Sequence, residues 1–172
     1  MKGFTIIEVL VVIVILAVAA GALTPVIRMG IDSWVFARDQ KEILAEGTLC
    51  MNRMIAEIRQ ITEVLAAPNE HMCVYVLLID STPLPFSFYQ SGTTQLYRTD
   101  YATSTDTILS DNLKGSNQGL VFIYLDEEMN DLGYPGNGSD RLKIRHIRIR
   151  LTLSIYGRDY VFQTTVTPLG LQ

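Results

Sequence analysis

Glu8 is the residue whose surroundings point most directly to chemistry, because its carboxylate lies in a largely apolar segment from Phe4 to Leu23. As a helix this segment would be about 30 Å long, enough to cross the hydrocarbon core of a bilayer. An unpaired carboxylate in that core costs at least about 2.5 kcal/mol, so we expect a neighbouring helix to supply its partner. The alternative is a signal anchor that tolerates an acid near its end. A cleaved secretory signal fits poorly, because its charged start is only Met1-Lys2 and no small-x-small site closes the segment.

Basic side chains form the second group that could bind a partner. Between residues 141 and 153 the apolar residues change from even to odd positions, so a β-bulge near Arg145-His146 is needed to keep them on one side of a strand. The bulge would gather Lys143, Arg145, Arg148 and Arg150 on the outer face. This basic face is either plainly solvated or a docking face for another protein, with DNA as the less favoured partner.

Charge is distributed unevenly around this basic stretch. Residues 68–140 contain two basic and ten acidic residues, whereas residues 141–172 contain six basic residues and one acid. This asymmetry indicates either pairing between surfaces of the same domain or a polar surface that binds a partner.

Residues 126–133 form an acid-rich loop whose oxygen donors could bind calcium through Asp126, Glu128 and Asp131. The loop departs from the EF-hand pattern, because Asp131 occupies the sixth position where that pattern requires glycine. We therefore favour a solvated hairpin loop and expect no resident metal or cofactor, with calcium as the alternative.

Catalysis is not expected. His71 and His146 are the only histidines and belong to different predicted elements, and no Gly-x-Ser-x-Gly, His-Glu-x-x-His or Walker-type motif occurs. Cys50 and Cys73 lack the spacing of metal ligands.

A disulfide between Cys50 and Cys73 is also disfavoured, because Cys50 would lie about 25 Å before the end of a helix. The six residues that follow that end span only about 20 Å. Both thiols are expected to be buried.

A long N-terminal helix must position Glu8. Pro25 removes one helical hydrogen bond and predicts a kink or a local opening. Residues 26–67 continue as an amphipathic helix, which Pro68-Asn69 is expected to end. Its apolar stripe consists of Ile27, Ile31, Trp34, Val35, Leu44, Met51, Ile55, Ile58, Ile61 and Leu65.

Strands must position the basic face and the acid-rich loop. After residue 68 the apolar period changes from 3.6 to about 2, which predicts about five or six largely antiparallel strands packed on the helix. The expected strands cover residues 72–79, 86–89, 95–98, 120–125, 142–156 and 160–166, with an exposed loop at 101–106. The fold class is therefore α+β.

The N-terminal residues Lys2-Gly3-Phe4-Thr5-Ile6-Ile7-Glu8-Val9-Leu10 resemble the cleavage and methylation motif of type IV prepilins and pseudopilins. The resemblance implies that a membrane peptidase cuts after Gly3 and that Phe4 becomes the N-methylated N-terminus. It also implies that Glu8 acts in filament assembly and that Pro25 is the family's helix-weakening proline.

Later segments resemble the minor pilins and the J-type minor pseudopilins of type II secretion. The resemblance rests on Met51-Asn52-Arg53-Met54, Arg59-Gln60, Leu96-Tyr97-Arg98, Phe122-Ile123-Tyr124-Leu125-Asp126 and the alternating residues 160–166. That family often has an Arg-Asn pair after the proline that follows its last strand, whereas Leu169-Gly170 follow Pro168 here.

Together these features predict a pilin-like chain with a leader (1–3), a transmembrane and filament-core helix (4–25), an amphipathic continuation (26–67) and a β-sheet head (68–172). The implied function is a structural subunit, a minor pilin or pseudopilin that helps to initiate or cap a filament. Its partners would be other pilins, prepilin peptidase and the inner-membrane assembly platform. It would lie in the bacterial inner membrane with an exported head, then in a pilus or pseudopilus. The alternatives are a nucleic-acid-binding minor pilin of a DNA-uptake machine and a monomeric, signal-anchored head.

Overall fold

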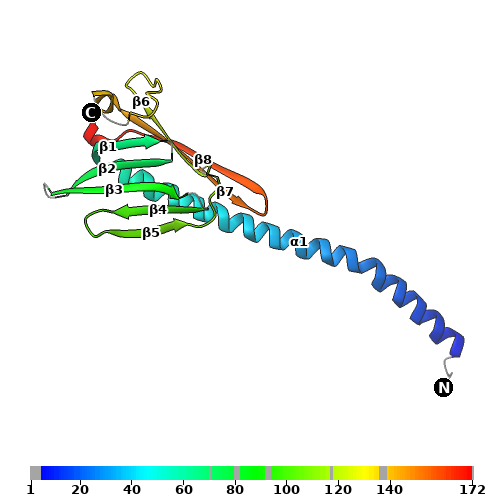
Figure 1. The fold of residues 1–172 in the computed structure, drawn as a ribbon. Helices are drawn as coiled ribbons and strands as arrows, with labels where there is room; N and C mark the ends of the chain where they lie inside the picture. Colours follow the sequence, from blue (N-terminus) through cyan, green and yellow to red (C-terminus); the bar gives the residue numbers. More distant parts are fainter. Residues whose placement is uncertain are drawn as a thin grey trace. The chain divides into compact units, whose positions relative to one another are not determined.

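The computed structural model describes residues 5–69, 71–79, 82–91, 94–116, 118–135 and 139–171. Gly3 and Phe4, where the predicted cleavage and methylation would occur, lie outside these residues. The chain divides into two compact units, Met1–Glu42 and Ile43–Gln172, which we call the N-terminal unit and the head (Figure 1).

The N-terminal unit is the first part of helix α1 (Ile6–Ile58), and none of its described residues is buried. The helix is long and apolar enough to cross a membrane. It continues through Pro25, so the predicted local opening does not interrupt it. Directly before the proline, the Thr24 hydroxyl donates a hydrogen bond of 2.9 Å to the Ala20 carbonyl, one turn earlier in the helix.

Residues 43–58 of α1 belong to the head and bury one face of the helix. The buried positions recur at intervals of three, four and one, as expected for a helix that contributes one stripe to a core. They are Ile43, Gly47, Cys50, Met51, Met54 and Ile58. Leu44, which we predicted to belong to this stripe, is exposed instead.

The predicted helix end at residue 67 is wrong, because α1 ends at Ile58 and strand β1 (Ile61–Asn69) follows. Ile61, Val64 and Ala67 are buried at intervals of three, which resembles the spacing of a helical stripe. Irregularities in the pairing of β1 with β2 replace the usual alternation of a strand and produce this spacing. Ile61 therefore packs in the core from a strand rather than from a helix.

The first sheet is antiparallel and has the order β1-β2-β3-β4-β5. Its other strands are β2 (Met72–Ile79), β3 (Thr82–Ser91), β4 (Gln95–Asp100) and β5 (Thr105–Ser110). The predicted strand at 72–79 and the β3–β4 hairpin are confirmed. The predicted loop at 101–106 is partly wrong, because the turn covers 101–104 and Thr105 already belongs to β5.

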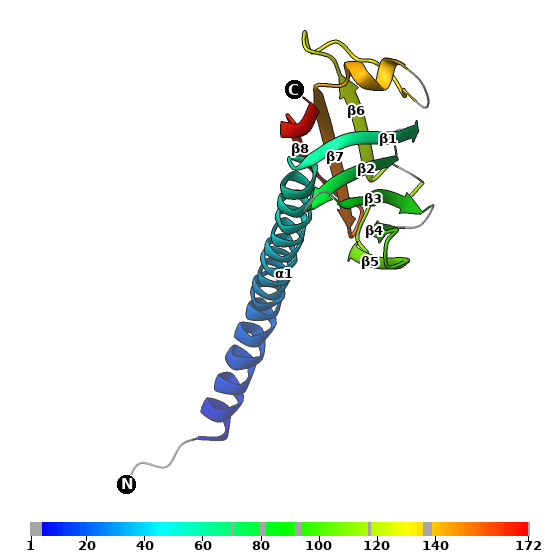
Figure 2. The same cartoon turned by 90° about the vertical axis from the view of Figure 1, so that its left-hand side faces the viewer.

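The second sheet is also antiparallel, with the order β6-β7-β8. It consists of β6 (Leu120–Leu125), β7 (His146–Ile155) and β8 (Arg158–Val166). In Figure 2 its strands run steeply across those of the first sheet. Short 3₁₀ helices precede and follow the β7–β8 hairpin, η1 (Ser139–Lys143) and η2 (Leu169–Leu171).

The predicted β-bulge at Arg145-His146 is wrong, because β7 begins only at His146. Leu142 lies in η1 with 75% of its surface exposed, and Ile144 is buried in the connection before the strand. The change of the apolar residues from even to odd positions therefore marks the junction between a helical turn and a strand. Within β7, buried and less buried residues alternate regularly up to Leu151.

The core of the head lies between α1 and the two sheets, which contact each other through β2 and β6. Its largest fully buried side chains include Tyr75, Tyr124, Phe88 and Phe122. Cys50 and Cys73 are buried and unpaired, as predicted. Burial raises the pKa of the Cys50 thiol to about 11 and that of Cys73 to about 12. The predicted α+β class, with one long helix packed on antiparallel sheets, is confirmed.

Candidate functional site

Glu8 lies in the first turn of α1, where the Thr5 carbonyl accepts hydrogen bonds from the backbone N–H groups of Glu8 (3.1 Å) and Val9 (3.3 Å). An acidic side chain is favourable there, because the positive end of the helix dipole lies at its N-terminus. The neighbouring apolar side chains of Ile6, Ile7, Val9 and Leu10 are all exposed. Within the described residues no cation forms an ion pair with Glu8, so its carboxyl group stands on an exposed apolar helix surface.

The four basic residues predicted to share one face are divided by the structure. Arg148 and Arg150 lie two positions apart on β7 and therefore project from the same face of the second sheet. Lys143 lies in η1, where its ammonium group contacts the Asp140 carboxylate at 2.8 Å. The Arg145 guanidinium donates to the carbonyls of Leu142 (3.0 Å) and Ile144 (3.2 Å). Lys143 and Arg145 thus make local contacts outside the strand.

The acidic loop is organised by its own backbone. Asp126 accepts hydrogen bonds from the backbone N–H (2.7 Å) and side-chain amide (3.0 Å) of Asn130, which hold the pKa of its carboxyl below the usual range. Asp131 accepts a hydrogen bond of 2.8 Å from the Gly133 N–H. In the part of the chain that the structure describes, no three His, Cys, Asp or Glu side chains gather closely enough to hold a metal. The expectation of no resident metal stays a prediction, with calcium at Asp126, Glu128 and Asp131 as its alternative.

Both histidines make hydrogen bonds that fix their rings. His71 Nδ1 donates to the Leu120 carbonyl at 3.0 Å, which ties the turn after β1 to the start of β6. His146 Nδ1 lies 2.8 Å from the Thr167 hydroxyl. His71 lies in the turn between β1 and β2, and His146 lies at the start of β7, so the two histidines belong to different elements, as predicted.

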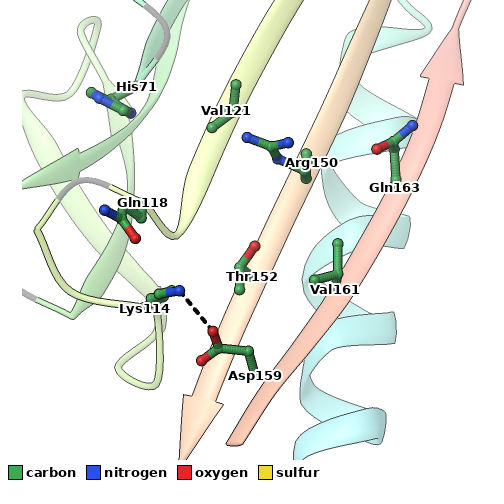
Figure 3. A pocket seen from close by; sticks show the side chains of 9 residues that line it. All are labelled: His71, Lys114, Gln118, Val121, Arg150, Thr152, Asp159, Val161 and Gln163. Carbon is green, nitrogen blue, oxygen red and sulfur yellow. Dashed lines mark hydrogen bonds and ion pairs between the residues drawn. The ribbon is translucent and has the colours of Figure 1, made fainter.

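A pocket of about 460 Å³ lies on the outer face of the second sheet (Figure 3). The strands of this sheet contribute Val121, Arg150, Thr152, Asp159, Val161 and Gln163. His71, Lys114 and Gln118 complete its wall from outside the sheet. Of these residues, sequence reasoning selected only Arg150, because the lining comes from segments that are distant in the chain and carry no shared motif.

Comparison with known proteins gives a match at the N-terminus alone. Residues 1–24 match the model of the prokaryotic N-terminal methylation motif, and this range includes both Glu8 and the start of the apolar helix. No curated protein and no solved structure matches the chain.

Proposed function

Because the chain carries the N-terminal methylation motif that defines type IV prepilin-like proteins, we propose that it is a minor pilin or minor pseudopilin. Prepilin peptidase would cut after Gly3, and Phe4 would become the methylated N-terminus. The mature subunit would stay in the inner membrane through α1 until it joins a pilus or a type II secretion pseudopilus. It acts there as a structural subunit and not as an enzyme.

The observation that carries the proposal is the combination of the motif with a fully exposed apolar helix. None of the described residues of the N-terminal unit is buried, although the segment before Pro25 is almost entirely apolar. Exposed apolar area of this extent is stable only in lipid or against other apolar helices. A subunit that moves from a membrane into a filament meets both conditions.

Glu8 supplies specificity to this assembly. Cleavage after Gly3 would create an N-terminal amine on Phe4, four positions from the carboxylate. In a low-dielectric surrounding, the Glu8 carboxylate of one subunit and the amine of its neighbour each remove the cost of burying the other. The pair forms only when two helices lie in the correct axial register, so it would select that register.

The minor role rests on the outer part of α1 and on the large head. Leu44 and Leu49 are exposed on the head's part of the helix, where a partner of matching shape could cover them. Large side chains at such positions suit a low-copy subunit that initiates or caps a filament. Quantitative mass spectrometry of sheared filaments should therefore find this chain at a small fraction of the main component, and its detection as the main component would reverse the assignment.

Glu8→Ala tests the proposal in the native host that lacks the chromosomal copy. We expect processing after Gly3 to continue, because the peptidase acts on the leader, while the number of surface filaments falls at least about tenfold. Glu42→Ala is the matched control, since Glu42 is exposed on the same helix but lies beyond the apolar segment. Equal filament numbers in the two variants would contradict the proposed role of Glu8.

A further inference from the structure

The pocket on the outer face of the second sheet has a floor and a polar rim. Val121 and Thr152 are buried and form its base, while Val161 and Gln163 project from β8 beside them. Figure 3 shows the Arg150 side chain extending from β7 toward β6, where Val121 lies. The pocket volume of about 460 Å³ accommodates a few side chains rather than a whole folded element.

The charges of the pocket do not cancel. Lys114 Nζ contacts Asp159 Oδ2 at 2.7 Å, and this hydrogen bond holds the pKa of the Asp159 carboxyl below its usual range. Among the described residues that line the pocket, Asp159 is the only carboxylate, and Lys114 already pairs with it. Arg150 forms no hydrogen bond or ion pair with any residue that the structure describes, so its guanidinium is the unneutralised charge of the site.

We propose that this pocket binds a carboxylate side chain from an acidic segment of another protein subunit, with Arg150 as the residue that pairs with it. A guanidinium presents parallel N–H donors that match the two oxygens of a carboxylate. The Thr152 hydroxyl and the side-chain amides of Gln118 and Gln163 supply further donors, while Val121 and Val161 pack against the methylene groups of an Asp or Glu. The inference rests on the proposed function for the nature of the partner, which would be a neighbouring subunit of the filament.

The charge pattern favours a protein segment over DNA. Binding to DNA draws its affinity from several cations that neutralise successive phosphates. Here one free guanidinium stands beside a carboxylate, Lys143 and Arg145 make local contacts elsewhere, and the whole chain has a net charge of −4. A single bidentate carboxylate fits this arrangement better than a row of phosphates.

The most acidic loop of the same head cannot fill its own pocket. Val121 lies near the start of β6, whereas Asp126 follows its end, so about 17 Å of strand separates them at about 3.4 Å per residue. This loop therefore does not fill the pocket of its own head, and we infer that the acidic segment comes from another chain. A contact between unlike surfaces of successive subunits also suits a filament, because such contacts generate open assemblies.

The test uses the full mature chain in detergent micelles and a fluorescent peptide with the sequence of residues 124–134, which carries Asp126, Glu127, Glu128 and Asp131. Fluorescence anisotropy should detect binding of this peptide, and a twin peptide with Asn and Gln at the four acidic positions should bind at least about tenfold more weakly. Arg150→Gln should cause a similar loss. Arg148→Gln is the matched control, because Arg148 lies on the same face of the same strand but outside the pocket. This variant should change the affinity for the peptide by less than about twofold.

Three results would overturn the proposal. They are no binding of the acidic peptide at low salt, equal binding of the amide twin, and equal losses in Arg150→Gln and Arg148→Gln. Tighter binding of a DNA duplex of about 20 base pairs, with a steep loss on adding salt, would replace the protein partner with nucleic acid. Near-ultraviolet circular dichroism of each variant verifies that the head is folded. Glu8→Ala should leave peptide binding intact, so failure of the pocket and failure of filament assembly are separate outcomes.

Discussion

The two parts of α1 have similar apolar content and opposite surroundings. Residues 6–42 bury no side chain, whereas residues 43–58 bury one face of the helix against two sheets. The head therefore stabilises its part of the helix by packing within the chain. The N-terminal unit exposes its apolar surface, so its stability depends on what surrounds it.

Two glutamates on this helix show the same contrast. In the head, Glu57 accepts hydrogen bonds from Arg98 Nε at 2.9 and 2.8 Å, and from the Tyr75 hydroxyl at 3.2 Å. The Arg98 guanidinium also lies 4.2 Å from the centre of the Phe86 ring. Glu8 has no ion-pair partner among the described residues. The chain thus satisfies the half-buried carboxylate of Glu57 internally, whereas the described residues supply no cation to Glu8.

The largest effect should distinguish two isoleucines on the same helix. Ile58 is fully buried, whereas Ile27 is 60% exposed, so Ile58→Ala should lower the free energy of unfolding of the head by about 2–5 kcal/mol. Ile27→Ala should leave it unchanged. Urea denaturation in micelles can follow the head through near-ultraviolet circular dichroism, since all eight tyrosines lie in the head and the one tryptophan, Trp34, reports the N-terminal unit. Equal losses in the two variants would contradict the division into two units.

Removing the internal partner of Arg98 should have a smaller effect. Glu57→Gln replaces a carboxylate that is 18% exposed and pairs with an arginine that is 14% exposed, so we expect a loss of about 2 kcal/mol in the same denaturation assay. Glu42→Gln removes an exposed carboxylate from the same helix and should have no measurable effect. A change below about 0.5 kcal/mol for Glu57→Gln would place this ion pair among ordinary surface pairs.

Glycines in the two units should respond differently to substitution by alanine. A Cβ at Gly47 would lie 2.3 Å from two atoms of the Phe162 ring, whereas a Cβ at Gly30 would meet nothing within 4 Å. Gly47→Ala should therefore destabilise the head by about 1 kcal/mol, after the gain in helix propensity is set against the crowding. Gly30→Ala should leave head unfolding unchanged. Adding Phe162→Leu to Gly47→Ala should recover part of the loss, and stabilisation by Gly47→Ala alone would contradict this close packing.

The smallest expected effect is that of calcium. The side-chain oxygens of Asp126 and Asp131 already accept local hydrogen bonds, so calcium should change neither the unfolding of the head nor the fluorescence of Trp34. Titration calorimetry of the full chain should give no heat beyond dilution. A saturable heat that disappears in Asp126→Asn would establish a calcium site in the acidic loop.

Several elements could be predicted from the sequence because each has a local signal. The apolar run before Pro25 predicts the helix, short continuous apolar runs predict β2 and β6, and alternating residues predict the β3–β4 and β7–β8 hairpins. The end of α1 could not be predicted, because the irregular pairing of β1 gives its buried residues a three-residue spacing. The division into two sheets depends on which strands pair, and that is decided by long-range contacts rather than by local periodicity.

The Glu8 motif and the pocket around Arg150 also differ in how far the sequence alone could predict them. Glu8 and its apolar surroundings are continuous in sequence, so the motif is visible without a structure. The pocket joins His71, Lys114, Arg150 and Asp159 from four separate segments, and Arg150 is distinguished only because Lys114 pairs with Asp159. Neither the pairing nor the absence of the predicted bulge has a local sequence signal.

The central claim is that the chain is processed and assembled as a prepilin-like subunit, and the intact mass of the purified protein tests it most directly. In cells with active prepilin peptidase, the chain should begin at an N-methylated Phe4, while a variant that loses Gly3 should keep the leader. A mature protein that retains Met1-Lys2-Gly3 in those cells would contradict the account.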